Sequence, residues 1–347
     1  MEAFKPVLSK IAHGESLTRA EAEAAFDSLL SGQATHAQMG AFLMGLRVRG
    51  ETIDELTGAV TAMRAKMLRV TAPEGAIDIV GTGGDGANTF NVSTLAAIIT
   101  AACGVPVAKH GSRAASSMTG ASDVLSELGV GVGISPEQVE ASLREANIGF
   151  MMAQAHHAAM AHVAPVRKET GARTLFNLIG PLSNPADVKL ILLGVFSDKW
   201  MLPIAKTLRE LGAERAWIVH GSDGLDEITT TGPTAVAALE GGNIRLFDIT
   251  PEDAGLKRAH IEDLRGGNPA YNAAALLAVL GGAKGAYRDI AVINSAAALV
   301  IAGKADDIAK GARMAEAALD DGRARATLEK LIQISNERPA ADTQAAV

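Results

Sequence analysis

The chain has 347 residues, with 32 Lys or Arg against 39 Asp or Glu, so its formal net charge is −7. Hydrophobic residues make up 48% of the chain and aromatic residues 3%. These values predict a folded protein with a large core and exclude an intrinsically disordered chain. A general nucleic-acid-binding protein is disfavoured, because such proteins need a basic surface and usually stacking aromatic side chains.

The single cysteine and the apolar runs predict the compartment. Cys103 has no partner for an internal disulfide, so we expect a reducing, cytoplasmic protein in which this thiol is buried and inert. The longest apolar run, residues 95–108, is interrupted by Gly104 and Pro106. It is too short to cross a bilayer and predicts a buried helix followed by a strand, so we expect no membrane segment.

Helical spacing dominates the first 70 residues. Thr18 lies three residues before Glu21, which predicts a capping box and a helix with Phe26, Leu29 and Leu30 on one face. Further helices are predicted over residues 37–47 and 52–68. We therefore expect an all-helical domain over residues 1–72, with a helical insertion returning to it near residues 165–185.

From residue 76, short apolar strands alternate with helical stretches. Strands are predicted at 77–80, 105–108, 190–195 and 216–219, a β-hairpin at 234–239 and 244–249, and helices from 269 to about 331. This order predicts an α/β fold: a small N-terminal all-helical domain and a larger α/β domain, residues 73–345, with a mainly parallel central sheet. The loops after the first four strands should lie on one rim, where such sheets bind ligands.

The loop after the first strand, GTGGDGANTFNVST at 81–94, is rich in glycine and opens a helix at Ser93 or Thr94. Its glycines satisfy the G-x-G-x-x-G pattern of dinucleotide sites. No acid follows between residues 86 and 122 to meet a ribose hydroxyl, and Asp85 would repel a bare pyrophosphate. Backbone amides holding another anionic ligand fit better, with an ordinary capped turn as the alternative.

The next two loops carry opposite charges. In KHGSRAASS, residues 109–117, Lys109 and Arg113 predict either an anion site or a solvated basic turn. In HGSDGLDEIT, residues 220–229, Asp223, Asp226 and Glu227 predict either a solvated turn or ligands of Mg²⁺. Mg²⁺ commonly takes one or two carboxylates and leaves its other positions to water and substrate phosphates.

A fourth stretch, residues 156–185, holds His156, His157, His162 and Arg167. The histidines do not have the spacing of a zinc site, so packing or ligand contact is the preferred interpretation. Arg167 is either a surface charge or a clamp for a carboxylate.

Taken together in this order, the four stretches closely resemble the anthranilate phosphoribosyltransferase family of the nucleoside-phosphorylase-like class. The resemblance implies transfer of the phosphoribosyl group from 5-phosphoribosyl 1-diphosphate (PRPP) to anthranilate in tryptophan biosynthesis, with Mg²⁺. It also implies a homodimer packed through the helical domains. The alternatives are a nucleoside phosphorylase-like enzyme and a related phosphoribosyltransferase with another aromatic acceptor. Retention of the acidic pair at 226 and 227 favours the transferase.

The resemblance also assigns site residues. It implies catalytic roles for Lys109, Asp226 and Glu227, and Mg²⁺ held by Ser93, Asp226 and Glu227. Anthranilate would contact Gly81, His110, Ser112, His157, Arg167 and Gly180. The family usually has Asn where this chain has Ser112, and this difference affects the expected contact with anthranilate. PRPP would contact Gly81, Gly84, Asp85, Thr89, Asn91, Val92, Ser93, Thr94, Lys109, His110, Gly111, Ser112, Arg113, Ala114, Ala115, Ser116, Ser117 and Ala121.

Overall fold

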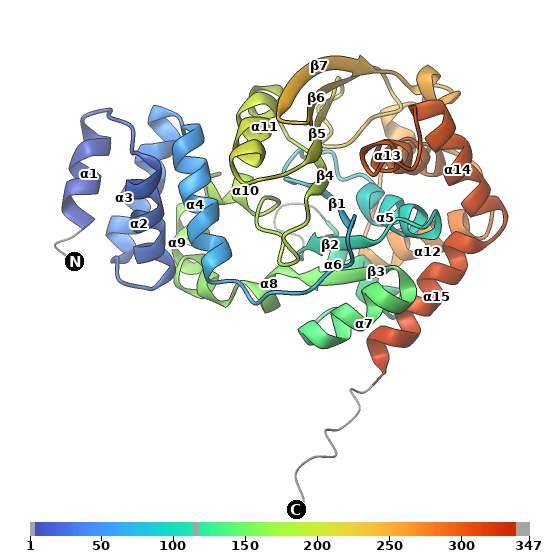
Figure 1. Cartoon of the computed structure of the whole chain (residues 1–347), viewed down its shortest axis with the longest axis horizontal. Helices are drawn as coiled ribbons and strands as arrows, with labels where there is room; N and C mark the ends of the chain where they lie inside the picture. Colours follow the sequence, from blue (N-terminus) through green and yellow to red (C-terminus); the bar gives the residue numbers. More distant parts are fainter. Residues whose placement is uncertain (1–3, 114–117, 338–347) are drawn as a thin grey trace, which may run out of the picture.

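The computed structural model describes residues 4–113 and 118–337, and it begins with a bundle of four helices at one end of the molecule (Figure 1). The bundle consists of α1 (Lys5–Ala12), α2 (Arg19–Leu30), α3 (His36–Arg49) and α4 (Ile53–Ala65). The last three confirm the predicted helices, and the bounds of α3 and α4 differ from the predicted ones by one to three residues. The sequence analysis missed α1, a short helix with only Ile11 buried.

Threonine caps and one buried acid organise the bundle. Thr18, Thr35 and Thr52 each form a capping box at the start of α2, α3 and α4. Glu55 is fully buried, and it accepts hydrogen bonds from the backbone N–H of Leu17 and of Thr52, both at 2.9 Å. Arg49 pairs with the same carboxylate, so this buried charge is compensated.

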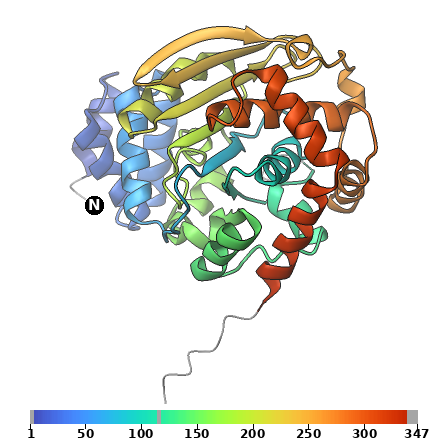
Figure 2. The same ribbon diagram turned by 45° about the vertical axis from the view of Figure 1, so that its right-hand side comes forward.

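A seven-stranded sheet forms the centre of the larger part (Figures 1 and 2). The strand order is β3-β2-β1-β4-β5-β6-β7, and the first five strands in this order are parallel to one another. β6 and β7 are antiparallel, so the predicted mainly parallel sheet and the predicted hairpin are both confirmed. The strands are β1 (Ile77–Gly81), β2 (Val107–Gly111), β3 (Ile148–Met152), β4 (Leu190–Gly194), β5 (Arg215–Gly221), β6 (Thr234–Glu240) and β7 (Asn243–Ile249).

Helices cover both faces of this sheet. The α-helices are α5 (Val92–Ala102), α6 (Ala121–Glu127), α7 (Pro136–Ala146), α8 (Ala153–His156), α9 (Ala164–Thr170), α10 (Phe176–Ile179), α11 (Met201–Glu210), α12 (Pro269–Leu280), α13 (Ala286–Ile301), α14 (Ile308–Asp320) and α15 (Arg323–Asn336). Short 3₁₀ helices lie at Ala158–His162, Asp198–Trp200, Pro251–Ala254 and Ile261–Leu264.

Side chains of the strands alternate between two cores. In β4, Leu190 and Leu192 pack with α5 and α12 to α15, whereas Ile191 and Leu193 pack with α11 and the N-terminal bundle. A period of two in a strand buried on both sides produces this division. The sheet therefore separates the bundle from the C-terminal helices, as Figure 1 shows.

The structure corrects two strand assignments. β2 begins and ends later than predicted, so Lys109 and His110 lie within the strand, where Lys109 is 3% exposed. The sequence analysis also missed β3, in which Gly149 and two methionines replace the usual β-branched residues. Helix α5 starts at Val92, one residue before the predicted start.

The segment near residues 164–182 packs against the bundle. The rings of Phe26 and Phe176 contact each other edge to face, with centroids 5.6 Å apart. Helices α3 and α9 are also in contact. The proposed domain boundary at residue 72 stays a prediction. None of the helices in the described part of the chain is both long and apolar enough to cross a membrane.

Cys103 is expected to be unreactive in the folded protein. Its side chain is buried, and burial raises the pKa of the thiol to about 11. The thiolate is the reactive form, so alkylation at pH 8 should be about a hundredfold slower in the native protein than in urea. Iodoacetamide labelling followed by mass spectrometry measures both rates. Equal rates would show that the thiol is accessible and ionised.

Candidate functional site

The candidate site lies where the strand order reverses. From β1 the chain adds β2 and β3 on one side and β4 and β5 on the other, and the loops after β1, β2, β4 and β5 leave the same edge of the sheet. This confirms the predicted common rim, and such switch points are where open α/β sheets bind ligands.

Two glycines leave space for the loop that carries Asp226 to approach this switch point. Gly81 and Gly194 are register partners at the ends of β1 and β4. A Cβ atom on Gly81 would overlap the carboxylate of Asp226, and a Cβ atom on Gly194 would overlap the Asp226 backbone. Asp226 therefore lies directly against the strand ends. The sequence analysis missed Gly194, because a glycine ending a strand resembles any turn glycine.

Asp226 and Glu227 are fixed by backbone donors of the glycine-rich loop and α5. The backbone N–H of Gly83 donates to Oδ2 of Asp226 (2.6 Å), and that of Ser93 donates to Oε1 of Glu227 (3.2 Å). Burial, followed by the nearby charge of Asp85, raises the pKa of Asp226 to about 7. Burial and the charge of Asp226 raise the pKa of Glu227 well above its ordinary range. The site thus concentrates negative charge that favours a cation.

Lys109 brings a buried positive charge to the same place. Its Nζ donates to the carbonyl oxygen of Ile79 (2.6 Å) and to Oγ of Ser93 (3.2 Å). Burial lowers the pKa of Lys109, and the charges of Asp78 and Glu227 oppose that shift. Three predicted site residues from three separate segments of the chain, Lys109, Ser93 and Glu227, are therefore joined by direct contacts.

The donor set at this place fits Mg²⁺. Asp226, Glu227 and Ser93 supply carboxylate and hydroxyl oxygens, which this hard cation prefers. Within the described residues, no group of three or more His, Cys, Asp and Glu is arranged to hold a metal by itself. The set therefore suits an ion that takes few protein ligands and completes its coordination with water and phosphate oxygens.

The glycine-rich loop is held by backbone and side-chain contacts. Oδ1 of Asp85 accepts from the N–H of Ala87 (3.2 Å), and Thr89 forms an isolated bridge with Arg265. The Arg173 guanidinium donates to the Gly84 carbonyl and lies over the Phe196 ring, 4.8 Å from its centroid. The sequence analysis did not single out Arg173.

Two of the residues predicted to contact PRPP have buried side chains. Val92 is 1% exposed and packs in the core, so a ligand could contact only its backbone. Thr94 is equally buried, and its Oγ1 has no hydrogen-bond partner among the described residues. A methyl group on Gly111 would contact Ala121, so these two residues lie close together as expected for one loop cluster.

Several of the predicted anthranilate residues lie close to the ends of α10. The rings of His110 and His157 lie 5.1 Å apart, and both residues are buried. Nε2 of His110 has no hydrogen-bond partner among the described residues, and the ring of His157 faces the backbone of Ser183. Burial lowers the pKa of His157 to about 4 and that of His110 well below its ordinary value, so both rings are neutral at pH 7. His110 also hydrogen-bonds the backbone of Gly180, which follows α10.

Arg167 approaches α10 from its other end. Its guanidinium lies over the ring of Phe176 at 5.6 Å from the centroid, and burial lowers its pKa. No carboxylate of residues 4–113 and 118–337 pairs with it, so this half-buried charge is available to an anionic ligand. Ser112 is exposed, and its Oγ donates to the Arg113 carbonyl (3.0 Å). The predicted residues Ala114, Ala115, Ser116 and Ser117 lie outside the described residues.

A buried polar pair, Asp78 and Asn184, lies beneath the site. The sequence analysis missed it. Asp78, fully buried in β1, accepts from the N–H of His110 (3.2 Å) and from Nδ2 of Asn184 (2.7 Å). Asn184 also donates to the Ala108 carbonyl (2.9 Å). Burial raises the pKa of Asp78 to about 6, against the opposing charge of Lys109. The sequence did contain a signal for this pair, because Asp78 is an acid in the middle of an otherwise apolar strand.

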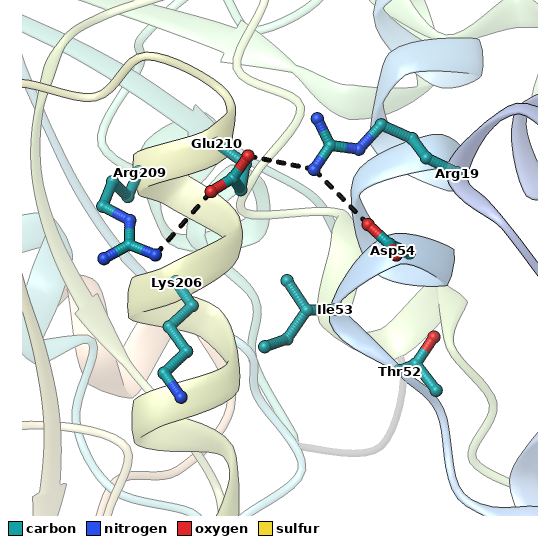
Figure 3. A pocket seen from close by; sticks show the side chains of 7 residues that line it. All are labelled: Arg19, Thr52, Ile53, Asp54, Lys206, Arg209 and Glu210. Carbon is teal, nitrogen blue, oxygen red and sulfur yellow. Dashed lines mark hydrogen bonds and ion pairs between the residues drawn. The ribbon is translucent and has the colours of Figure 1, made fainter.

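A surface pocket of about 330 Å³ lies elsewhere, between α2, α4 and α11 (Figure 3). In it the Arg19 guanidinium pairs with Glu210 at 3.0 Å and with Asp54 at 3.4 Å. None of the predicted substrate residues lines this pocket. Its ion pairs join the bundle to α11, and it is not the candidate functional site.

Comparison with known proteins places the chain in a class. A model of the glycosyl transferase family, helical bundle domain, matches residues 5–67, and one of the glycosyl transferase family, a/b domain, matches residues 73–325. The chain is therefore a glycosyl transferase of this two-domain type.

More specific relatives identify the family. An anthranilate phosphoribosyltransferase of Methylocella silvestris is 66% identical over 336 residues, which cover 97% of this chain and 96% of the relative. The crystal structure of such an enzyme from Thermus thermophilus matches with a TM-score of 0.90 and 41% identity, over 95% of this chain and 99% of that one. The chain belongs to the anthranilate phosphoribosyltransferase family.

Two structures of the Saccharomyces cerevisiae enzyme contain ligands. The complex with PRPP and Mg matches with a TM-score of 0.88 and 28% identity, over 96% of this chain and 98% of that one. The complex with 4-fluoroanthranilate matches with a TM-score of 0.87 and 26% identity over the same shares.

Proposed function

We propose that the chain transfers the phosphoribosyl group of PRPP to the amine of anthranilate, giving N-(5-phosphoribosyl)anthranilate and diphosphate, in tryptophan biosynthesis. The observation that carries the proposal is the arrangement at the strand switch point. Buried Lys109 and the acidic pair Asp226 and Glu227 meet beside a glycine-rich loop. The rings of His110 and His157 lie next to the segment that follows α10, and the Arg167 guanidinium lies over Phe176 at its start. The names of the relatives and the ligands in their structures agree with a PRPP side and an anthranilate side of the site.

In this reaction the amine nitrogen forms a bond to C1 of the ribose, the bond from C1 to the diphosphate oxygen breaks, and the nitrogen releases one proton. The aromatic amine is unprotonated at neutral pH, so no strong base is needed to activate it. We expect Lys109, the N–H groups of the glycine-rich loop and the start of α5 to hold the diphosphate. Most of the rate enhancement should then come from positioning the two substrates and from stabilising charge on the leaving group.

Ser93, Asp226 and Glu227 would hold Mg²⁺, whose charge would offset that of the diphosphate. Asp85 would act through this cation or through water, because its own charge repels a phosphate. The PRPP site would be completed by Gly81, Gly84, Thr89, Asn91 and Thr94.

On the acceptor side, Arg167 would pair with the anthranilate carboxylate, since it is half-buried and has no acidic partner in the described part of the chain. His110 and His157 are neutral at pH 7 and could contact the substrate amine or its ring. Ser112 would offer one hydroxyl where an asparagine would offer an amide.

We also propose that the protein is a cytoplasmic homodimer formed through the helical bundle. An apolar stripe on α3 supports this, because Ala37, Ala41 and Val48 are exposed on one side of the helix, and Val48 is 82% exposed. Sedimentation velocity is expected to give the mass of two chains, and Val48→Asp should shift the protein to one chain. A wild-type monomer would refute the dimer.

The proposed function is tested by the fluorescence change on converting anthranilate to its phosphoribosyl derivative. Purified protein with PRPP, anthranilate and MgCl₂ should form product, and chelation of the Mg²⁺ should stop it. Release of a free base from a nucleoside and inorganic phosphate, without anthranilate turnover, would instead indicate a phosphorylase.

Arg167→Ala is expected to raise the anthranilate KM by about 10- to 100-fold and to change the PRPP KM less than about twofold, because a lost charge-assisted pair costs about 1.5–3 kcal/mol. Steady-state kinetics in both substrates measures this. Lys168→Ala is the matched control, since Lys168 is an exposed cation on the same helix. A rise in the PRPP KM instead would mean that the two substrate sites are reversed.

A further inference from the structure

A closed circuit of four hydrogen bonds lies beside the glycine-rich loop. Asn272, on α12, donates from Nδ2 to Oδ1 of Asn91 (3.0 Å), and its Oδ1 accepts from the N–H of Gly267 (2.7 Å). Thr119 closes the circuit: its hydroxyl donates to the Gly267 carbonyl (2.7 Å), and its carbonyl accepts from Nδ2 of Asn91 (3.3 Å). The circuit therefore joins the segments before α5, before α6 and before α12.

The circuit fixes the orientation of the Asn91 amide. Oδ1 of Asn91 faces Asn272 and Nδ2 faces Thr119, so a flip of the amide would set like groups against each other at both ends. The Tyr287 hydroxyl also donates to the Asn91 carbonyl (3.2 Å). One N–H of the Asn91 amide remains for a ligand.

Asn91 in turn lies directly at the start of α5. It is the residue before Val92, the first residue of the helix, and Ser93 follows in the first turn. Ser93 contacts both Lys109 and Glu227. A shift of Asn91 therefore changes the placement of backbone donors and of the group that links the buried lysine to the acidic pair.

The surroundings of Asn272 make packing a poor explanation for its side chain. Asn272 is 1% exposed on a helix, PAYNAAALLAVL, that contains no charged residue. A buried amide is costly unless it is hydrogen-bonded, and an apolar side chain would fill the same space without that cost. Both hydrogen bonds of this side-chain amide belong to the circuit.

We infer that Asn272 is a positioning residue for the sugar-diphosphate donor, acting through Asn91 and the start of α5 without touching the substrate. The inference rests on the proposed function and deepens it. The donor side alone should respond, because no hydrogen bond among the described residues joins the circuit to His110 or His157.

The test is a double-mutant cycle with Asn272→Ala and Asn91→Ala. Asn272→Ala is expected to weaken PRPP binding about tenfold by calorimetry with MgCl₂, to raise the PRPP KM equally and to leave the anthranilate KM within about twofold. In the Asn91→Ala background it should add less than about twofold, because the pathway is already broken. Thr119→Val, which cuts the circuit at another bond, should act in the same direction.

Ser335→Ala is the control for general destabilisation. Ser335, on α15, is 2% exposed and its hydroxyl accepts from the N–H of Gly131 (2.9 Å), so Ser335→Ala should lower Tm and leave PRPP binding unchanged. Unaltered PRPP binding in both Asn272→Ala and Thr119→Val would overturn the inference, as would fully additive effects in the cycle. PRPP binding without product formation by the wild type would instead count against the proposed function.

Discussion

Replacing the acidic pair, Asp226→Asn with Glu227→Gln, is expected to lower kcat/KM for PRPP by about 1,000-fold while the protein stays folded. The amide oxygens can still accept from the N–H groups of Gly83 and Ser93, so the local geometry is retained. Burial and mutual repulsion already disfavour ionisation of both acids, so neutral amides should be tolerated and Tm should hold or rise. What is lost is the charge that binds the cation offsetting the leaving diphosphate.

Asp223→Asn provides the matched control in the same loop. Asp223 is exposed, and its Oδ2 accepts from the hydroxyls of Thr229 (2.6 Å) and Thr231 (2.7 Å), so it organises the turn and does not join the acidic pair. We expect near-wild-type turnover for this variant. Anthranilate fluorescence measures activity, and melting with and without MgCl₂ and PRPP measures ligand binding. Near-full turnover in the double variant would mean that the pair is only a solvated turn.

Local signals were sufficient for the main elements and for the charged loops. Three Thr-capped helices, glycine-ended strands and a Gly-Gly hairpin are encoded within a few residues of one another. Asp226 and Glu227 stood out because adjacent acids at the end of a strand need an explanation. Roles in substrate binding came from a family resemblance and stay predictions here.

Residues that act through long-range contacts were beyond the sequence. Asn184 meets Asp78 across 106 positions, and Asn272 meets Asn91 across 181. No spacing rule links such pairs, because the sheet and the helices on it bring them together. The shift of β2 has the same origin: charged residues normally favour loops, but Lys109 is stabilised inside the strand by the Ile79 carbonyl and Ser93.

A single methyl group at the end of β4 is expected to disable the site. Gly194→Ala would place Cβ inside the space of the Asp226 backbone, which, unlike the end of a flexible side chain, cannot rotate away. Gly194 is also held in place, since it pairs with Gly81 and Val219 and its carbonyl accepts from the N–H of Thr82 (2.9 Å). Either the acidic loop or the strand must move, and both movements separate Asp226 from Gly83.

The expected result for Gly194→Ala is a loss of about 1–3 kcal/mol in the free energy of unfolding and a fall of at least about 100-fold in kcat/KM. Urea denaturation and assays below the melting transition measure the two effects separately. Gly133→Ala is the control, because a Cβ atom there meets nothing within 4 Å, and it should alter neither quantity. Wild-type kcat/KM in Gly194→Ala would contradict the close approach of Asp226 to β4.

Gly81→Ala distinguishes crowding of a side chain from crowding of the backbone. Its Cβ would meet mainly the Asp226 carboxylate, with the backbone oxygen farther away at 3.3 Å. The carboxylate can rotate aside, so Gly81→Ala should cost less stability than Gly194→Ala. It should still lower activity strongly, because a rotated Asp226 carboxylate moves away from both the Gly83 N–H and the position of the cation. Equal destabilisation by the two variants would show that the Asp226 backbone, and not its carboxylate, is what both glycines accommodate.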